Sequence, residues 1–146
     1  MNNSKVNDAI YCFNSGFNCS QSVLSVYSEE FGLSKDIALK TACGLGAGMG
    51  RLQETCGAVT GAFLVIGMKY GNNNHNDKTA KEQTYALVQE FALRFEERNK
   101  TTKCSDLLGV NLQSVDKSLA SKRVREICPG LVKDAVEILE SIFASK

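Results

Sequence analysis

The residues of this chain best suited to chemistry are its cysteines, of which there are six among 146 residues. Four of them lie at or just before the start of an expected helix. Unpaired backbone N–H groups and the positive end of the helix dipole stabilise a thiolate there, and thiolates attack disulfides and bind metals. We therefore predict that the working thiols are Cys19, Cys56, Cys104 and Cys128.

The other two cysteines have a different setting. Cys12 and Cys43 fall inside expected helices, beside apolar faces. Free cysteine is among the most buried residue types and packs like a small hydrophobic side chain. We expect both to fill space in the core.

The segment after Cys56 is the most informative part of the sequence. It reads Cys56-Gly57-Ala58-Val59-Thr60-Gly61-Ala62, with Gly57 and Gly61 one helical turn apart. Glycine inside a helix costs about 1 kcal/mol relative to alanine, so a close approach of another group should compensate. The backbone at Gly57, Ala58 and Gly61 is thus a candidate cofactor-binding surface. A tight helix–helix contact explains the spacing equally well.

The elements that must position these residues are expected to be helices. Apolar residues recur at spacings of three and four, and the chain has one proline. The expected fold is all-α, a single-domain bundle (residues 1–146) of about six to eight helices. Pro129 suits the first position of a helix, and Gly44 to Gly50 suit a loop. The expected helices cover residues 5–13, 19–31, 34–43, 56–70, 79–99, 104–108, 114–126 and 129–143. Tyr85, Val88, Phe91, Ala92 and Phe95 form the apolar stripe of the longest one.

Several short motifs match a known pattern together. They are Gly16-Phe17-Asn18-Cys19, Gly48-Met49-Gly50-Arg51, Cys56-Gly57-Ala58-Val59-Thr60-Gly61, Cys104 with Leu107-Leu108-Gly109, and Cys128-Pro129. In these the chain resembles the redox-active cysteine proteins named for the pattern C-GCAxxG-C-C, although it reads Cys56-Gly57 where that label puts Gly before Cys. The resemblance implies redox activity and the same four working cysteines. Similar domains occur joined to cytochrome-type electron-transfer proteins, which implies a [2Fe-2S] cluster as the candidate cofactor.

Three functions remain open at this point. The first is a thiol oxidoreductase in which Cys56 is the more nucleophilic thiol and Cys19, Cys104 or Cys128 resolves it as a disulfide. The second is an electron-transfer module whose four thiolates hold a [2Fe-2S] cluster. Either would act on a redox partner protein or a small electron carrier. The third is a non-catalytic helical interaction protein, such as a homodimer packed on exposed apolar helix faces.

Charge and hydropathy argue against nucleic-acid-binding and membrane proteins. A formal net charge of +1 is too small to attract the phosphate backbone of nucleic acid. The longest apolar stretch, Cys56 to Met68, has 13 residues, whereas a membrane span takes about 20. We therefore expect no membrane insertion. The first residues lack a basic and then apolar signal pattern, which predicts a cytoplasmic protein. A structural zinc site is less favoured, because a domain with this many apolar helices should not require a metal ion to fold.

Overall fold

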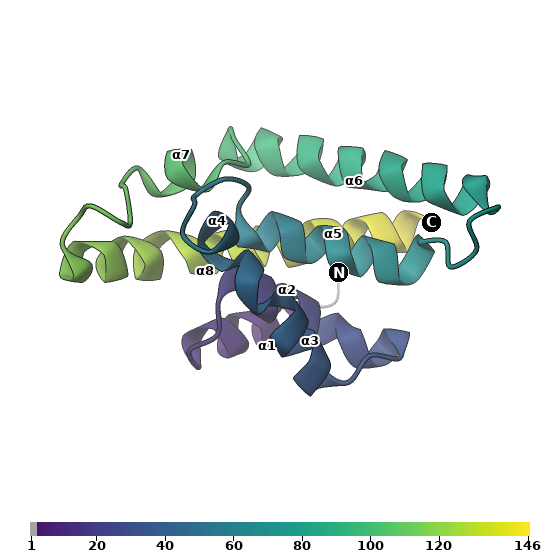
Figure 1. Ribbon diagram of the computed structural model, residues 1–146, viewed down its shortest axis with the longest axis horizontal. Coiled ribbons are helices and arrows are strands. Elements are labelled where there is room, and N and C mark those ends of the chain that lie inside the picture. The colour runs from purple at the N-terminus through teal and green to yellow at the C-terminus, as the bar shows by residue number, and fades with distance from the viewer. Residues whose placement is uncertain (1–2) are drawn as a thin grey trace.

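The computed structural model describes residues 3–146, and helices account for most of this range (Figure 1). The α-helical elements are α1 (Asn3–Asn14), α2 (Cys19–Ser28), α3 (Lys35–Ala42), α4 (Gly46–Met49), α5 (Gly57–Tyr70), α6 (Lys78–Asn99), α7 (Cys104–Leu108) and α8 (Lys117–Ser145). Two 3-10 turns, Glu29–Phe31 and Cys43–Leu45, flank α3. The prediction of an all-α bundle is confirmed.

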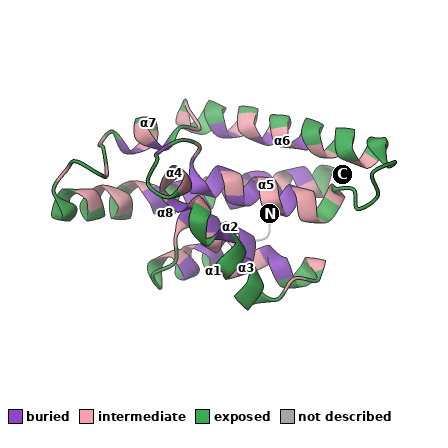
Figure 2. Cartoon of the chain, in the orientation of Figure 1, coloured by how far each residue is buried: buried purple, intermediate pink, exposed green. Residues whose placement is uncertain are grey.

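Three long helices form one part of the bundle and the N-terminal helices form the other. In Figure 1, α5, α6 and α8 run along the long axis, while α1, α2 and α3 lie below them. Helix α2 packs against α5, and α8 contacts α1, α2, α5 and α6. The buried residues of these helices belong to a single hydrophobic cluster, and Figure 2 shows its purple faces concentrated on α2, α5 and α8.

The start of α2 is fixed by a capping box. The Asn18 side chain accepts a hydrogen bond from the Gln21 backbone N–H at 2.9 Å, and the Gln21 side chain accepts one from the Asn18 N–H at 2.9 Å. The Asn18 amide also donates to the Cys43 carbonyl at 2.9 Å. These bonds satisfy N–H groups that a helix start leaves unpaired. They also make Cys19 the first residue of α2.

The predicted helix boundary at Pro129 is wrong. The stretches expected at 114–126 and 129–143 form one helix, α8, with Pro129 inside it. Proline removes a helical hydrogen bond and costs about 3 kcal/mol in a helix interior. Burial compensates, because Val124 and Ile127 pack against the same core as Leu131 and Val132. Cys128 therefore lies in the middle of a helix and not at a helix start.

Two smaller expectations also fail. Cys43 is exposed, because α3 passes into a 3-10 turn at this residue, whereas Cys12 is buried as expected. Tyr85 on α6 is 52% exposed, and Leu87 is the residue buried in that turn. Both errors arise where a helix ends or turns a side chain away from the shared core.

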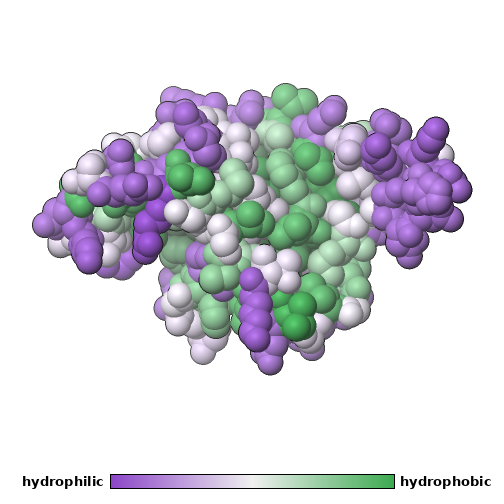
Figure 3. Space-filling model, in the orientation of Figure 1, coloured by the Kyte–Doolittle hydropathy of each residue, from purple (hydrophilic) through white to green (hydrophobic). Residues whose placement is uncertain are grey.

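The surface is polar at both ends of the molecule. Figure 3 shows hydrophilic side chains gathered at the two ends of the long axis and more hydrophobic ones over the middle. Within residues 3–146, no helix is both long enough and apolar enough to cross a membrane.

The contact between α2 and α5 depends on Gly61. A Cβ atom at this position would lie 2.9 Å from the Ser20 carbonyl oxygen and 3.1 Å from its Cα, whereas one at Gly67 would meet nothing within 4 Å. Gly61→Ala should lower the free energy of unfolding by about 1–3 kcal/mol through overpacking. Gly67→Ala, the matched control, should raise it by up to about 1 kcal/mol. Urea denaturation of both variants measures the difference, and equal effects would contradict the close contact.

Candidate functional site

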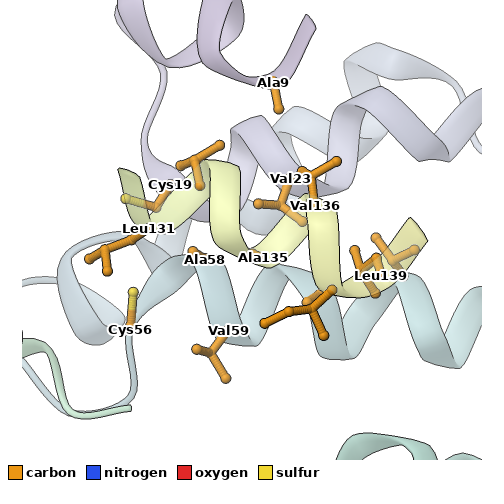
Figure 4. Close-up of a cluster of buried hydrophobic side chains, with 14 of the residues drawn as sticks. Ala9, Cys19, Val23, Cys56, Ala58, Val59, Leu131, Ala135, Val136 and Leu139 are labelled. Atoms are coloured by element: carbon orange, nitrogen blue, oxygen red, sulfur yellow. The ribbon is translucent and has the colours of Figure 1, made fainter. Parts of the chain in front are cut away.

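The four cysteines predicted to work together line one cavity of about 290 Å³. Cys19 is the first residue of α2, Cys56 is the N-cap of α5, Cys104 is the first residue of α7, and Cys128 lies inside α8. All four side chains are buried. Figure 4 shows Cys19, Cys56 and Leu131 grouped at one end of the core. The fold thus brings together four thiols whose successive separations in the sequence are 24 to 48 residues.

Cys19 and Cys56 are neighbours because α2 and α5 approach closely. A Cβ atom at Gly57 would lie 3.2 Å from the Ser20 nitrogen and 3.3 Å from the Cys19 Cβ. Of the three backbone positions predicted as cofactor-binding, Gly57 lines the cavity, whereas Ala58 and Gly61 do not. The Gly57–Gly61 spacing therefore serves a tight helix contact, which includes the Cys19 side of the cavity.

Cys56 and Cys104 are held together by backbone pairing. Thr55 and Lys103 form an antiparallel bridge. On one side of it the Cys56 N–H donates to the Thr102 carbonyl at 2.8 Å, and on the other the Cys104 N–H donates to the Glu54 carbonyl at 2.6 Å. These bonds fix the starts of α5 and α7 relative to each other.

The glycine-rich segment forms a left-handed turn that closes one wall of the cavity. Residues 47 to 51 all have positive φ, between 56° and 70°. Left-handed backbone costs roughly 1–2 kcal/mol for each non-glycine residue, here Ala47, Met49 and Arg51. Only glycine fits at Gly48, since a Cβ there would lie 2.7 Å from the Cys104 Cβ. The strain is retained where the backbone must pass directly over a thiol.

Gln53 is a site residue that the sequence did not single out. Its buried side chain donates to the Val110 carbonyl at 2.8 Å and accepts from the Leu112 N–H at 2.8 Å. Its hydrogen bonding to Cys104 partly opposes the rise that burial causes in the pKa of that thiol. Gln53 lies in a loop, so no helical periodicity indicates that it is buried.

Cys19 and Cys128 interact within the cavity. Hydrogen bonding to Cys128, together with burial, raises the pKa of Cys19 well above its ordinary value. The same hydrogen bonding lowers the pKa of Cys128. Hydrogen bonding to the charged form favours that form. Cys128 is thus the thiol that ionises first, with Cys19 holding the remaining proton.

Burial dominates at the other two thiols. It raises the pKa of Cys56 to about 12, although the N–H groups of Ala58 and Val59 at the helix start act in the opposite direction. Burial also raises the pKa of Cys104 to about 11, and repulsion from Cys128 adds to it. The helix start therefore does not by itself make Cys56 a thiolate. This environment favours Cys128 over Cys56 as the first nucleophile.

The cavity is otherwise apolar. Within the described residues, no charged side chain lines it, and the polar side chain beside the thiols is that of Asn18. The apolar part of the wall includes Phe13, Phe17, Leu107, Leu112, Val124 and Leu131. Most of these residues come from helix ends and loops, which is why their shared location was not evident from periodicity.

Iron–sulfur clusters are held by cysteine thiolates, and the four cysteines that line this cavity supply sulfur atoms of that kind. Their arrangement does not fit a single ion. Over residues 3–146, no three cysteine, histidine or carboxylate side chains are placed to hold one metal ion.

Comparison with known proteins agrees with the cysteine pattern. A family model described as "Putative redox-active protein (C_GCAxxG_C_C)" matches residues 17–142. The chain belongs to this family. The resemblance inferred from the motifs around Cys19, Cys56, Cys104 and Cys128 is thus confirmed at the level of the family. No curated protein and no solved structure matches the chain.

The raised pKa of Cys56 should make the protein less stable in alkali. The thiol has an ordinary pKa of 9.0 and ionises at about 12 when folded. Its contribution to stability is complete below pH 9 and is lost as the pH rises through 12, because only the unfolded state ionises between these values.

Denaturation from pH 8 to 11 tests this expectation. Cys56→Ser should make the decline in unfolding free energy shallower, by up to about 1.4 kcal/mol per pH unit above pH 9. Cys12→Ser changes a buried cysteine outside the cavity, and it should keep the wild-type slope. Identical slopes in all three proteins would contradict the burial effect at Cys56.

Proposed function

We propose that this chain is a thiol–disulfide redox protein in which Cys19 and Cys128 interconvert between two thiols and a disulfide. The observation that supports this most directly is that Cys19 and Cys128 line one cavity and that their interaction lowers the pKa of Cys128. Disulfide exchange requires two thiols within reach of each other, one of which ionises more easily than the other. Membership of a redox-active family agrees with this function.

The proposed reaction reduces a disulfide on a partner protein or a small carrier. The Cys128 thiolate attacks one sulfur of the substrate, the substrate S–S bond breaks, and a mixed disulfide forms while the other substrate sulfur leaves as a thiolate. Cys19 then loses its proton and attacks the Cys128 sulfur. This forms the Cys19–Cys128 disulfide and releases the second substrate thiolate. Two electrons pass to the substrate, and the two thiol protons end on its sulfurs.

We propose that Cys56 and Cys104 belong to the same site in a later role. Both line the cavity, and burial keeps both protonated at neutral pH. As a second dithiol they can reduce the Cys19–Cys128 disulfide only after one of them loses its proton to become a thiolate, which their raised pKa values make slow at neutral pH. We propose a cytoplasmic location, a compartment in which thiols of this kind stay reduced.

The order of thiol reactivity tests the assignment of Cys128. Limited alkylation with iodoacetamide at pH 7, followed by peptide mass spectrometry, should modify Cys128 at least about tenfold faster than Cys56. The larger thiolate fraction of Cys128 outweighs its lower intrinsic nucleophilicity. Exposed Cys43 serves as the reference for an accessible thiol. Faster modification of Cys56 would restore it as the nucleophile and contradict the proposed order.

The disulfide itself is tested by oxidation. Protein treated with 2-hydroxyethyl disulfide should lose two thiols and yield a Cys19–Cys128 crosslinked peptide. Cys19→Ser should stop at the mixed disulfide on Cys128, whereas Cys12→Ser and Cys43→Ser should behave like the wild type. Iron and acid-labile sulfide in protein purified without oxygen would instead overturn the proposal in favour of a four-cysteine [2Fe-2S] module.

A further inference from the structure

The cavity around the four thiols limits what can react there. It has a volume of about 290 Å³ and, among the residues described, no charged side chain in its wall. A cavity of about 150 Å³ holds benzene, so this one accommodates a group of roughly a dozen non-hydrogen atoms. A charged group inside would lose its hydration without a partner. The reacting end of a substrate should therefore be small and apolar.

A second groove adjoins this cavity. Ala47, Leu112 and Val124 line both spaces, so the groove borders the thiol site. Its remaining wall is formed by Arg51, Lys117, Ala120 and Ser121. It thus combines an apolar floor with two cationic side chains and no acidic one.

The two cations are available to a ligand. Both side chains are exposed, and across residues 3–146 neither Arg51 nor Lys117 takes part in an ion pair. The neighbouring carboxylate, Asp116, accepts hydrogen bonds from Ser118 and Leu119 at the start of α8. The Gln113 side chain donates to the Arg51 carbonyl at 2.9 Å, which holds that residue at the groove.

We propose that the substrate is an amphipathic acid: its apolar end carries a dithiol or disulfide that enters the cavity, and its carboxylate lies between Arg51 and Lys117. This inference rests on the proposed thiol–disulfide function and adds the substrate class. When the substrate is a dithiol, it reduces the protein. One substrate thiolate attacks the Cys19–Cys128 disulfide and forms a mixed disulfide. The second substrate thiol then closes a cyclic disulfide, and two electrons and two protons pass to Cys19 and Cys128.

Dihydrolipoate and dihydrolipoamide provide a matched pair of probes. They have the same number of non-hydrogen atoms and the same dithiol, and they differ in a carboxylate against a neutral amide. Protein oxidised at Cys19 and Cys128 is mixed with each probe, and the rate of disulfide loss is measured against probe concentration. Dihydrolipoate should reach half-maximal rate at a concentration about three- to tenfold lower, as expected for contact with two exposed cations. The maximal rates should agree.

Charge variants locate the carboxylate. The double variant Arg51→Gln with Lys117→Gln should bring the ratio between the two probes close to one, and 0.5 M NaCl should do the same in the wild type. Lys133→Gln changes an exposed lysine on the same helix but outside the groove, and it should keep the ratio.

The outcomes separate this inference from the proposed function. Reduction by both probes at equal concentrations, or a ratio unchanged in the double variant, would overturn the carboxylate assignment and leave the thiol chemistry intact. No reduction by either probe or by dithiothreitol would mean that the Cys19–Cys128 disulfide does not take part in exchange. In that case the proposed function fails as well.

Discussion

The close approach of α2 and α5 is the constraint on which the rest of the site depends. Two glycines one turn apart, Gly57 and Gly61, let the backbone of Ser20 lie directly on α5. Because Cys19 begins one helix and Cys56 caps the other, the same contact places both sulfurs at one end of the core. The conformational cost of Gly61 inside α5, about 1 kcal/mol, is offset by this packing.

Burial then decides how the thiols ionise. A thiolate in the cavity would be poorly hydrated and would be repelled by its neighbours, so the pKa of Cys56 and of Cys104 rises. The pKa of Cys19 rises first because of hydrogen bonding to Cys128 and then because of burial. Of the four cysteines, only Cys128 has a lowered pKa, because hydrogen bonding with Cys19 favours its charged form. A helix start is therefore a weaker influence on a buried cysteine than desolvation and a directed hydrogen bond.

Loop structure around the cavity is maintained at an energetic cost. The left-handed turn from Ala47 to Arg51 is unfavourable for its non-glycine residues, yet it packs Gly48 against Cys104. The segment before α8 has no regular secondary structure, and the Gln53 side chain hydrogen-bonds its backbone at Val110 and Leu112. Strain of this kind is typical of functional sites, where the surrounding contacts determine a conformation that the local sequence disfavours.

The sequence by itself determined the helical class, most helix positions and the family, because apolar spacing, glycine ends and the motifs around the cysteines are local signals. It also identified the four cysteines that share the cavity, although it placed Cys128 at a helix start. Proline and glycine preferences are weak against the burial of a continuous apolar face, so α8 continues through Pro129. Only the fold shows that Cys19 and Cys128 influence each other's ionisation, that Gln53 is buried, and that Arg51 and Lys117 line the groove beside the cavity. Those relations depend on contacts between residues far apart in the chain, and desolvation is a property of the folded interior that no local pattern records.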